Sequence, residues 1–384
     1  MTDSSRINDI QPFHVMALLA RAKELESQGK DIIHLEIGEP DFPTPQPIVD
    51  AGIAAIKDGD IHYTPALGLP ALRKAIAAFY KTRYALNLSS HRVVITPGAS
   101  GALILALGVI MQEEDEVLLA DPGYPCNKNF VRFLSGKICS ISVDASTGYQ
   151  LSLKHLKEHW SDKTKVVMVA SPSNPTGTLL SHKELSAMAA YVKEKGAFLI
   201  VDEIYNGLIY NEEVSTALSI DDNIIVINSF SKYFNMTGWR LGWLVAPESL
   251  IDKMDKLAQN IFLAAPTPAQ YAALAAFDSE TIGILESYKT KFKQRRDFLL
   301  PKLRQLGFVI DTEPQGAFYI YANCAKFSDD SYQFCYEVLE NIGVAITPGK
   351  DFGNNKANTF VRFSYTTSIK RLEEAISRLT AYLR

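Results

Sequence analysis

Residues 228–242 read Asn-Ser-Phe-Ser-Lys-Tyr-Phe-Asn-Met-Thr-Gly-Trp-Arg-Leu-Gly and are the most informative segment of the chain. The apolar run Ile-Ile-Val-Ile just before them is typical of a buried strand, so we expect Lys232 close to a strand end. Two hydroxyl side chains, Ser229 and Ser231, flank this lysine, and Arg240 follows. Hydroxyls and a guanidinium together suit a bound phosphate. A lysine beside such a phosphate indicates an amine that reacts with a carbonyl group.

The ligand that combines a phosphate with an aldehyde is pyridoxal 5'-phosphate, which enzymes hold as a Schiff base on lysine. A short Ser-x-Ser-Lys also occurs in surface turns without a ligand, but residues 228–242 match a longer pattern. They resemble the pyridoxal-phosphate attachment signature of the class I and II aminotransferases. The matching positions are Ser229, Ser231, Lys232, Arg240, Leu241 and Gly242. The resemblance extends from about residue 38 to residue 362, nearly the whole chain.

Bulk composition is that of an ordinary globular protein. The chain has 384 residues, and its 47% hydrophobic content allows a sizeable core in two domains. A net charge of -4 leaves no basic excess, so no nucleic-acid partner is expected. No apolar run approaches the roughly 18 residues of a membrane span, and no signal peptide is evident, so no membrane partner is expected. The four cysteines lack Cys-x-x-Cys spacing and indicate free thiols in a reducing cytoplasm.

Short apolar runs alternate with helical patterns through the middle of the chain. We expect helices at 70–84, 99–111 and 181–195, and strands at 92–96, 116–120, 166–170, 197–201 and 224–227. Ser181 and Glu184 also predict a capping box. Strands that are apolar on both faces and separated by helices favour a mostly parallel sheet covered on both sides. Ligands of such sheets bind beyond the carboxyl ends of the strands.

The pattern changes in the last quarter of the chain. A long charged helix is expected at 285–300, followed by antiparallel strands near 307–311, 316–321 and 359–364. A helix at 12–29 and a strand at 32–37 are expected to join them. These patterns predict a large α/β domain of residues 46–284. They also predict a smaller α+β domain of residues 1–45 and 285–384.

Asp202 follows the predicted strand 197–201, and Tyr205 comes three residues later. A carboxylate at a strand end can pair with a protonated pyridine nitrogen and keep the ring cationic, which favours electron withdrawal. Tyr205 can reach the ring's phenolic oxygen. The alternative for Asp202 is a cap on the next turn, and the adjacent Glu203 is expected to face elsewhere.

Other motifs also follow predicted strands. The small residues Ala99 and Ser100 begin a helix, where a phosphate can approach backbone N–H groups. Tyr124 can stack on a flat ring, with a core aromatic as the alternative. Asn174 lies between two prolines, which fix it or simply form an ordinary turn. The resemblance implies that the aromatic covers the pyridine face. It also implies that the asparagine bonds the ring oxygen and contacts the substrate carboxylate.

The resemblance also implies the substrate contacts. Arg362 alternates with apolar residues, so it is either an edge charge or an inward carboxylate ligand. The family pattern makes it the clamp for the substrate α-carboxylate, with Gly38 as a backbone contact on the other side. Tyr63 resembles the tyrosine that reaches the cofactor phosphate of a partner subunit, which implies a homodimer.

One motif points to a different chemistry. His155-Leu-Lys-Glu-His159 matches the inverted zinc-protease pattern His-x-x-Glu-His. Its charged flanks are typical of a solvated helix face, and no third ligand is evident nearby. We therefore expect no metal.

Together these features predict the fold-type I architecture of pyridoxal-phosphate enzymes, an α/β fold with a mostly parallel seven-stranded sheet. The predicted activity moves the amino group of an L-amino acid to a 2-oxo acid through a Schiff base on Lys232. One alternative is a related lyase or synthase, of the C–S lyase or aminocyclopropane-carboxylate synthase type. A second is an aminotransferase-like DNA-binding regulator, which would need an additional N-terminal segment. No motif identifies the amino donor or grips a side-chain carboxylate.

Overall fold

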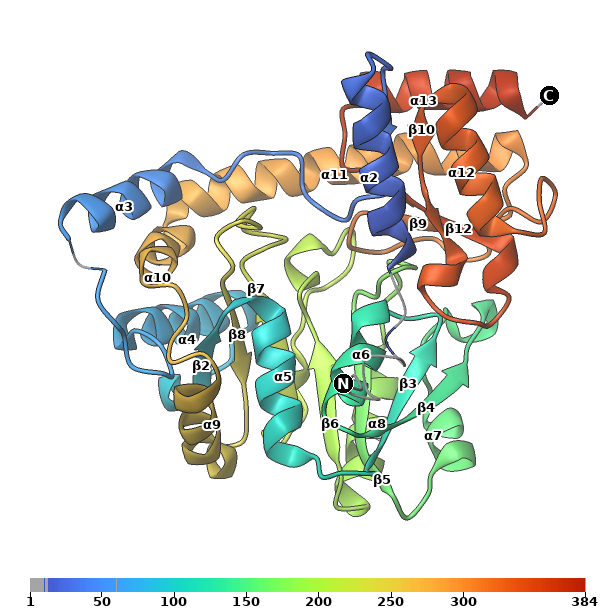
Figure 1. The fold of residues 1–384 in the computed structure, drawn as a ribbon. Coiled ribbons are helices and arrows are strands. Elements are labelled where there is room, and N and C mark those ends of the chain that lie inside the picture. The colour runs from blue at the N-terminus through green and yellow to red at the C-terminus, as the bar shows by residue number, and fades with distance from the viewer. Residues whose placement is uncertain (1–9, 11–12, 60, 384) are drawn as a thin grey trace, which may run out of the picture.

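A computed structural model describes residue 10, residues 13–59 and residues 61–383 of the chain. Its largest element is a mixed seven-stranded sheet, in which only β8 runs against its neighbours (Figure 1). The strand order is β2 (Val93–Thr96), β8 (Gly242–Val245), β7 (Ile225–Ser229), β6 (Phe198–Asp202), β5 (Thr164–Ala170), β3 (Glu116–Asp121) and β4 (Lys137–Ser142). All five strands predicted for this sheet are present. Two strands were not predicted. β4 carries several exposed side chains, and β8 begins at Gly242, the last residue of the lysine motif.

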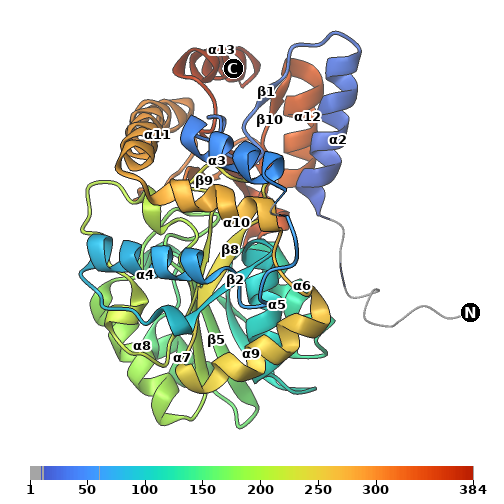
Figure 2. The same cartoon turned by 90° about the vertical axis from the view of Figure 1, so that its left-hand side faces the viewer.

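Both faces of the sheet are buried, which explains why its strands read as continuous apolar runs. In β6, Leu199 and Val201 belong to one core cluster, whereas Ile200 belongs to the other. The first cluster packs under α4 (Pro70–Tyr84), α8 (His182–Glu194) and α10 (Thr267–Leu274). The second packs under α5 (Gly98–Ile110) and α9 (Glu248–Ile261). Three further helices of this region are α3 (Gln46–Lys57), which packs on α10 (Figure 2), α6 (Pro125–Phe133) and α7 (Leu153–His159).

Local sequence signals account for these helices. α4 starts with Pro70 at its first turn and buries Leu72, Ile76 and Tyr80 at four-residue spacing. α8 is capped by Ser181, whose hydroxyl accepts the Glu184 N–H. The predicted capping box is nevertheless incomplete, because the Glu184 carboxylate accepts the backbone N–H of Leu153 at the start of α7 instead.

A second group of elements comes from both ends of the chain. It contains the antiparallel sheet β11 (Thr347–Pro348), β12 (Phe360–Ser364) and β9 (Tyr319–Asn323), and the parallel pair β1 (Ile33–His34) and β10 (Val344–Ala345). Its helices are α2 (His14–Ser27), α12 (Ser331–Ile342) and α13 (Ile369–Tyr382). The predicted strand at 32–37 is reduced to two residues, and 307–311 contributes only an isolated bridge at Val309. Pro12, where the first helix was predicted to begin, lies outside the described residues.

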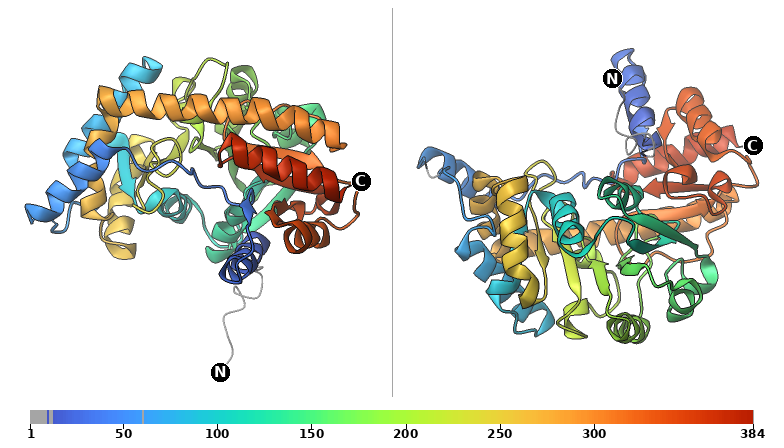
Figure 3. Two further views of the ribbon diagram at one scale, coloured as in Figure 1. Left: turned by 90° about the horizontal axis from the view of Figure 1, so that it is seen from above. Right: turned by 60° about the horizontal axis from the view of Figure 1, so that its bottom comes forward.

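The longest helix, α11 (Ser279–Leu306), extends from the α3 and α10 region to α13 (Figure 3). It continues through residue 285, so the predicted domain boundary falls inside a helix. Arg295 of α11 forms a bidentate ion pair with Asp41, which ties the helix to the loop after β1.

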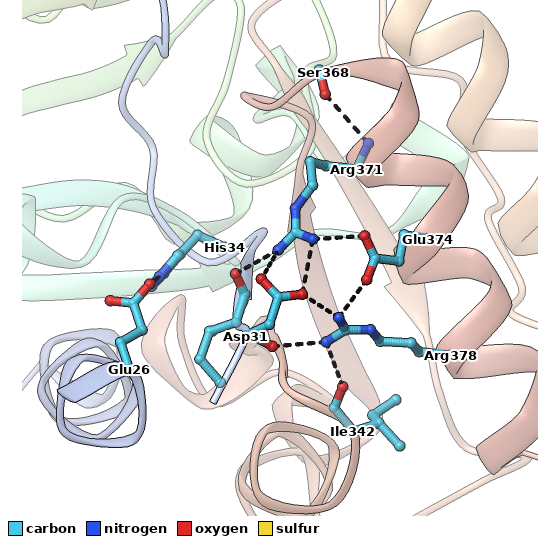
Figure 4. Close-up of polar contacts among 9 residues, drawn as sticks. Glu26, Asp31, His34, Ile342, Ser368, Arg371, Glu374 and Arg378 are labelled. Atoms are coloured by element: carbon cyan, nitrogen blue, oxygen red, sulfur yellow. Dashed lines mark hydrogen bonds and ion pairs between the residues drawn. The ribbon is translucent and has the colours of Figure 1, made fainter. Parts of the chain in front are cut away.

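The N-terminal segment is also fastened by charge (Figure 4). The Asp31 carboxylate accepts hydrogen bonds from Arg371 and Arg378 of α13. Hydrogen bonds from these arginines lower the pKa of Asp31 to about 2. Glu374 bonds both guanidiniums on the same helix. Within the described part of the chain, no helix combines the length and apolarity needed to cross a membrane.

Candidate active site

A cavity of about 450 Å³ opens at the carboxyl ends of the parallel strands. Asp202 ends β6, Ser229 ends β7, and Asn174 and Tyr124 follow β5 and β3. Twelve of the thirteen residues predicted for the site line this cavity: Gly38, Ala99, Ser100, Tyr124, Asn174, Asp202, Tyr205, Ser229, Ser231, Lys232, Arg240 and Arg362. The adjacent strand ends converge because β5, β6 and β7 are parallel neighbours.

Tyr63 is the exception. Its side chain is 86% exposed and does not line the cavity. Ile61 in the same loop, and Ile53 and Ile56 of α3, are also exposed apolar side chains. The loop therefore presents apolar surface outward.

Lys232 is partly buried, and its Nζ donates a hydrogen bond of 2.6 Å to the Gly38 carbonyl. Burial lowers the pKa of this lysine to about 8, and the nearby guanidiniums of Arg362 and Arg240 act in the same direction. A lysine with this pKa is about one-tenth neutral at pH 7, far more than an ordinary lysine, and the neutral amine is the form that acts as a nucleophile or base.

Asp202 is almost fully buried, with 6% of its surface exposed. Its carboxylate accepts a hydrogen bond from the backbone N–H of Ile204, at 3.0 Å. Burial raises the pKa of Asp202 to about 6. Among the described residues Asp202 forms no ion pair; the charge of Lys232 lowers its pKa without direct contact, and burial outweighs this effect.

Glu203, the neighbouring acid, faces away from the cavity as predicted. Its carboxylate accepts hydrogen bonds from Thr216, from Asn206 and from the backbone N–H of Ala217. Burial raises the pKa of Glu203 to about 7. The two adjacent acids are thus equally buried but differ in surroundings.

Arg240 faces the start of α5. It has φ of +54°, in the left-handed region that non-glycine residues rarely adopt, and its Nη1 donates to the Thr237 carbonyl at 3.0 Å. A Cβ at Gly98 would lie 2.7 Å from Arg240 Nη2, so only glycine allows this approach. No acid pairs with Arg240 in the described parts of the chain. The guanidinium, the first N–H groups of α5 and the Ser231 hydroxyl suit an anionic group.

Arg362 is buried on the opposite side of the cavity, on β12. Its Nη1 donates to Asn174 Oδ1 at 2.9 Å, and its Nη2 donates to the Glu36 carbonyl at 2.5 Å. Its guanidinium carbon lies 4.3 Å from the Tyr319 ring centroid and 4.9 Å from that of Phe352. The Arg362 Nε is buried without a hydrogen-bond partner. A buried donor of this kind suits a carboxylate ligand.

Tyr319 is a site residue that the sequence did not reveal. Its hydroxyl lies 2.7 Å from the Tyr205 hydroxyl, and a Cβ at Gly38 would collide with it. Residues opposite each other in an antiparallel pair share a face, and Arg362 pairs with Tyr321 two positions further on. Tyr319 and Tyr321 alternate along β9 and therefore share a face with Arg362. The sequence shows this alternation but not the register between β9 and β12, so it could not place Tyr319 near Arg362.

The zinc-like motif has an ordinary structural role. His155 forms a capping box with Ser152 at the start of α7, and His159 bonds the His155 carbonyl. No three His, Cys, Asp or Glu side chains in the described ranges come together as a metal site.

Comparison with known proteins agrees with this geometry. The family model for aminotransferases of class I and II matches residues 30–379. The chain is 40% identical over 385 residues to the (5-formylfuran-3-yl)methyl phosphate transaminase of Methanocaldococcus jannaschii, with 99% of each chain covered. It is 37% identical to the valine–pyruvate aminotransferase of Mycobacterium tuberculosis, over 100% of this chain and 99% of the relative. A crystal structure of an aminotransferase from M. tuberculosis has a TM-score of 0.96 and 37% identity, and covers 100% and 99% of the two chains. The chain belongs to the class I and II aminotransferases and has their fold-type I architecture.

This family depends on pyridoxal phosphate, and the cavity fits that group. An unpaired buried carboxylate at Asp202 suits a protonated ring nitrogen, and the unpaired guanidinium of Arg240 suits a phosphate. Lys232 lies in the same cavity. The three features that the cofactor requires are therefore present together.

Proposed function

We propose that this aminotransferase binds pyridoxal 5'-phosphate on Lys232 and transfers the amino group of an L-amino acid to a 2-oxo acid. The observation that carries the proposal is the composition of the cavity. A lysine of lowered pKa shares it with the unpaired carboxylate of Asp202 and two guanidiniums that have free donors. These are the groups that a phosphorylated pyridine aldehyde and an amino acid need.

The cofactor would be held by residues from several strand ends. Lys232 would bind it covalently, and Asp202 would pair with its ring nitrogen. Arg240, Ser229, Ser231, Ala99 and Ser100 would hold its phosphate, with Tyr124 against the ring and Asn174 and Tyr205 at its phenolic oxygen. When bound, this cofactor withdraws electrons from the substrate Cα and so makes the Cα proton acidic.

The substrate would be oriented by the groups on the opposite wall. Arg362 would bind the α-carboxylate through its free Nε and its terminal nitrogens, supported by Asn174, with the backbone of Gly38 on the other side. Once the substrate amine has displaced it from the cofactor, the free Lys232 Nζ would remove the Cα proton and return it at the carbon on the other side of the C–N bond. Its pKa of about 8 suits this acid–base role.

Further proposals concern the assembly. We propose a homodimer in which Tyr63 reaches the cofactor phosphate of the partner subunit; the exposed apolar side chains around this tyrosine support it. The division into residues 46–284 and residues 1–45 with 285–384 stays a prediction. The four cysteines form no disulfide, which supports a cytoplasmic location.

Borohydride reduction followed by peptide mapping tests the attachment site. We expect the purified protein to be yellow and the reduced label to be on Lys232, and a label on another lysine would contradict the assignment. Product analysis tests the reaction. A transaminase forms 2-oxo acid from the donor only in proportion to added acceptor, whereas a lyase of this fold forms it without one.

A further inference from the structure

The cations that line the cavity are few. The lining residues include only three, namely Lys232, Arg240 and Arg362. Under the proposed function, on which this inference rests, each is already engaged by the cofactor or by the α-carboxylate. The described walls therefore offer no further cation to a substrate side chain.

Two acids lie in the same walls. Glu36 is fully buried, and one of its oxygens is 2.7 Å from His34 Nδ1. Glu39 is exposed at the rim and accepts a hydrogen bond from Thr237. The negative charge of Glu39 raises the pKa of Lys232, so its field reaches the reacting amine. The hydrogen bond to Glu36 raises the pKa of His34 to about 9, so the charge of Glu36 is balanced by this histidine and the unbalanced acid is Glu39. A second carboxylate on the substrate would meet Glu39 and find no free cation among the lining residues, which is unfavourable in a poorly solvated cavity.

The remaining wall is apolar. It consists of Val15 and Met16 in the first turn of α2, Phe13 just before it, Ile37 after β1 and Leu103 on α5. Figure 1 shows α2 descending from the second group of elements toward α6, so its first turn lies beside the carboxyl edge of the large sheet. Three of these five apolar side chains thus come from the N-terminal end of α2.

The first turn of α2 is held firmly in place. Phe13, at the N-cap position, provides no side-chain cap. Instead, the buried carboxylate of Asp351 accepts the backbone N–H groups of His14 and Val15, each at 2.8 Å. Phe352, the next residue, packs on the Arg362 guanidinium. The first turn of α2 and the guanidinium of Arg362 therefore both contact one short segment, residues 349–352.

From these contacts we infer that the site selects amino donors with apolar side chains and discriminates against acidic donors. The α-carboxylate is bound at Arg362 and the amino group is directed to Lys232. The third substituent of the substrate Cα then faces the wall formed by Phe13, Val15, Met16, Ile37 and Leu103.

The test compares donors of similar size in the holoenzyme, with pyruvate as the acceptor. We expect kcat/KM for leucine to exceed that for aspartate by on the order of 100-fold or more, as loss of a buried charge partner predicts. Asparagine separates polarity from charge, and it should fall between the two. Equal use of leucine and aspartate, or a preference for aspartate, would overturn the inference.

A matched pair of variants tests the wall itself. Met16 is 53% exposed, so the protein should tolerate polar replacements there. Met16→Lys should raise kcat/KM for aspartate relative to leucine by about tenfold, the effect of about 1.4 kcal/mol, whereas Met16→Gln should lower the leucine value without this gain. If Met16→Lys and Met16→Gln gave the same aspartate-to-leucine ratio, the substrate side chain would not face Met16 and the inference would be wrong.

The borohydride label separates this inference from the proposed function. A protein whose Lys232 is labelled by borohydride but which prefers aspartate would refute only this inference. A protein with no label on Lys232 would refute the proposed function itself.

Discussion

Replacing Asp202 by asparagine should stabilise the cofactor-free protein at neutral pH while abolishing most of its activity. The side chain is buried, and burial raises the pKa of its carboxyl to about 6 from an ordinary 3.8. An acid whose pKa is raised in the folded state costs stability when it ionises. The cost is absent below about pH 4, grows as the pH rises to about 6, and is constant above that. Asparagine has no charge to bury and can still accept the Ile204 N–H.

The size of the effect follows from the shift. Each pKa unit corresponds to about 1.36 kcal/mol, so ionised Asp202 costs the folded, cofactor-free protein about 3 kcal/mol at pH 7. For a chain of 384 residues this is a rise of about 4 °C in the unfolding midpoint. Thermal unfolding of cofactor-free wild type and Asp202→Asn between pH 4 and pH 8 should show curves that coincide at the acid end and separate above it.

The activity of Asp202→Asn should fall although its stability rises. Without a carboxylate at the ring nitrogen, we expect turnover to fall by on the order of 10² or more, a loss of about 3 kcal/mol. Added pyridoxal phosphate should also stabilise the wild type more than the variant. Glu203→Gln is the matched control, because Glu203 is equally buried but bonds Thr216, Asn206 and Ala217 outside the cavity. It should keep turnover near the wild-type value whatever its stability. An Asp202→Asn variant that is no more stable at pH 7 would contradict the raised pKa of Asp202, and one that turns over normally would show that Asp202 only caps its turn.

Three further predictions test other parts of the molecule. Arg362→Lys should raise KM for the amino acid and for the 2-oxo acid together, by about tenfold or more, because a charged hydrogen bond contributes about 1.5–3 kcal/mol; a change confined to one substrate would make Arg362 a side-chain selector. Mixing Lys232→Ala protein with Tyr63→Phe protein should restore activity above that of either parent, since mixed dimers contain one site with both native residues, and exchange without a gain would refute the shared site. Asp31→Asn should lower the unfolding midpoint above about pH 4, because the pKa of Asp31 is lowered to about 2, and this difference should shrink at high salt and vanish as the pH falls through 2. A salt-independent difference would show that the bonds from Arg371 and Arg378 act through shape alone.

Much of the fold was readable because its signals are local. Strands β2, β3, β5, β6 and β7 are short apolar runs, since each is buried on both faces of the sheet. The antiparallel strands predicted near 316–321 and 359–364 are present as β9 and β12, but two other elements were not predicted correctly. β1 retains only two of its six predicted residues, because its length is set by pairing with β10, more than 300 residues away. β4 was missed because it lies at the sheet edge, where several side chains are exposed and the apolar run is broken.

Residues of the candidate site were likewise predictable where the signal is local and not where it depends on tertiary contacts. Lys232, Asp202 and Arg240 could be predicted because each belongs to a contiguous motif whose chemistry is carried by the residues themselves. Tyr319 and the apolar wall at the start of α2 carry no such motif. They belong to the site only because β9 pairs with β12 in one register and because Asp351 binds the first turn of α2.

By itself, the sequence determined the class of fold, the lysine and the acid that a pyridoxal-phosphate enzyme needs, because short-range patterns of burial and spacing encode them. Only the tertiary structure decided which side chains line the cavity. Hydrogen-bond partners, burial and the shifted pKa values of Lys232 and Asp202 arise from groups that lie far apart in the chain and meet only after folding. The proposed preference for an apolar donor rests on these tertiary contacts, so it could not be derived from the order of the residues.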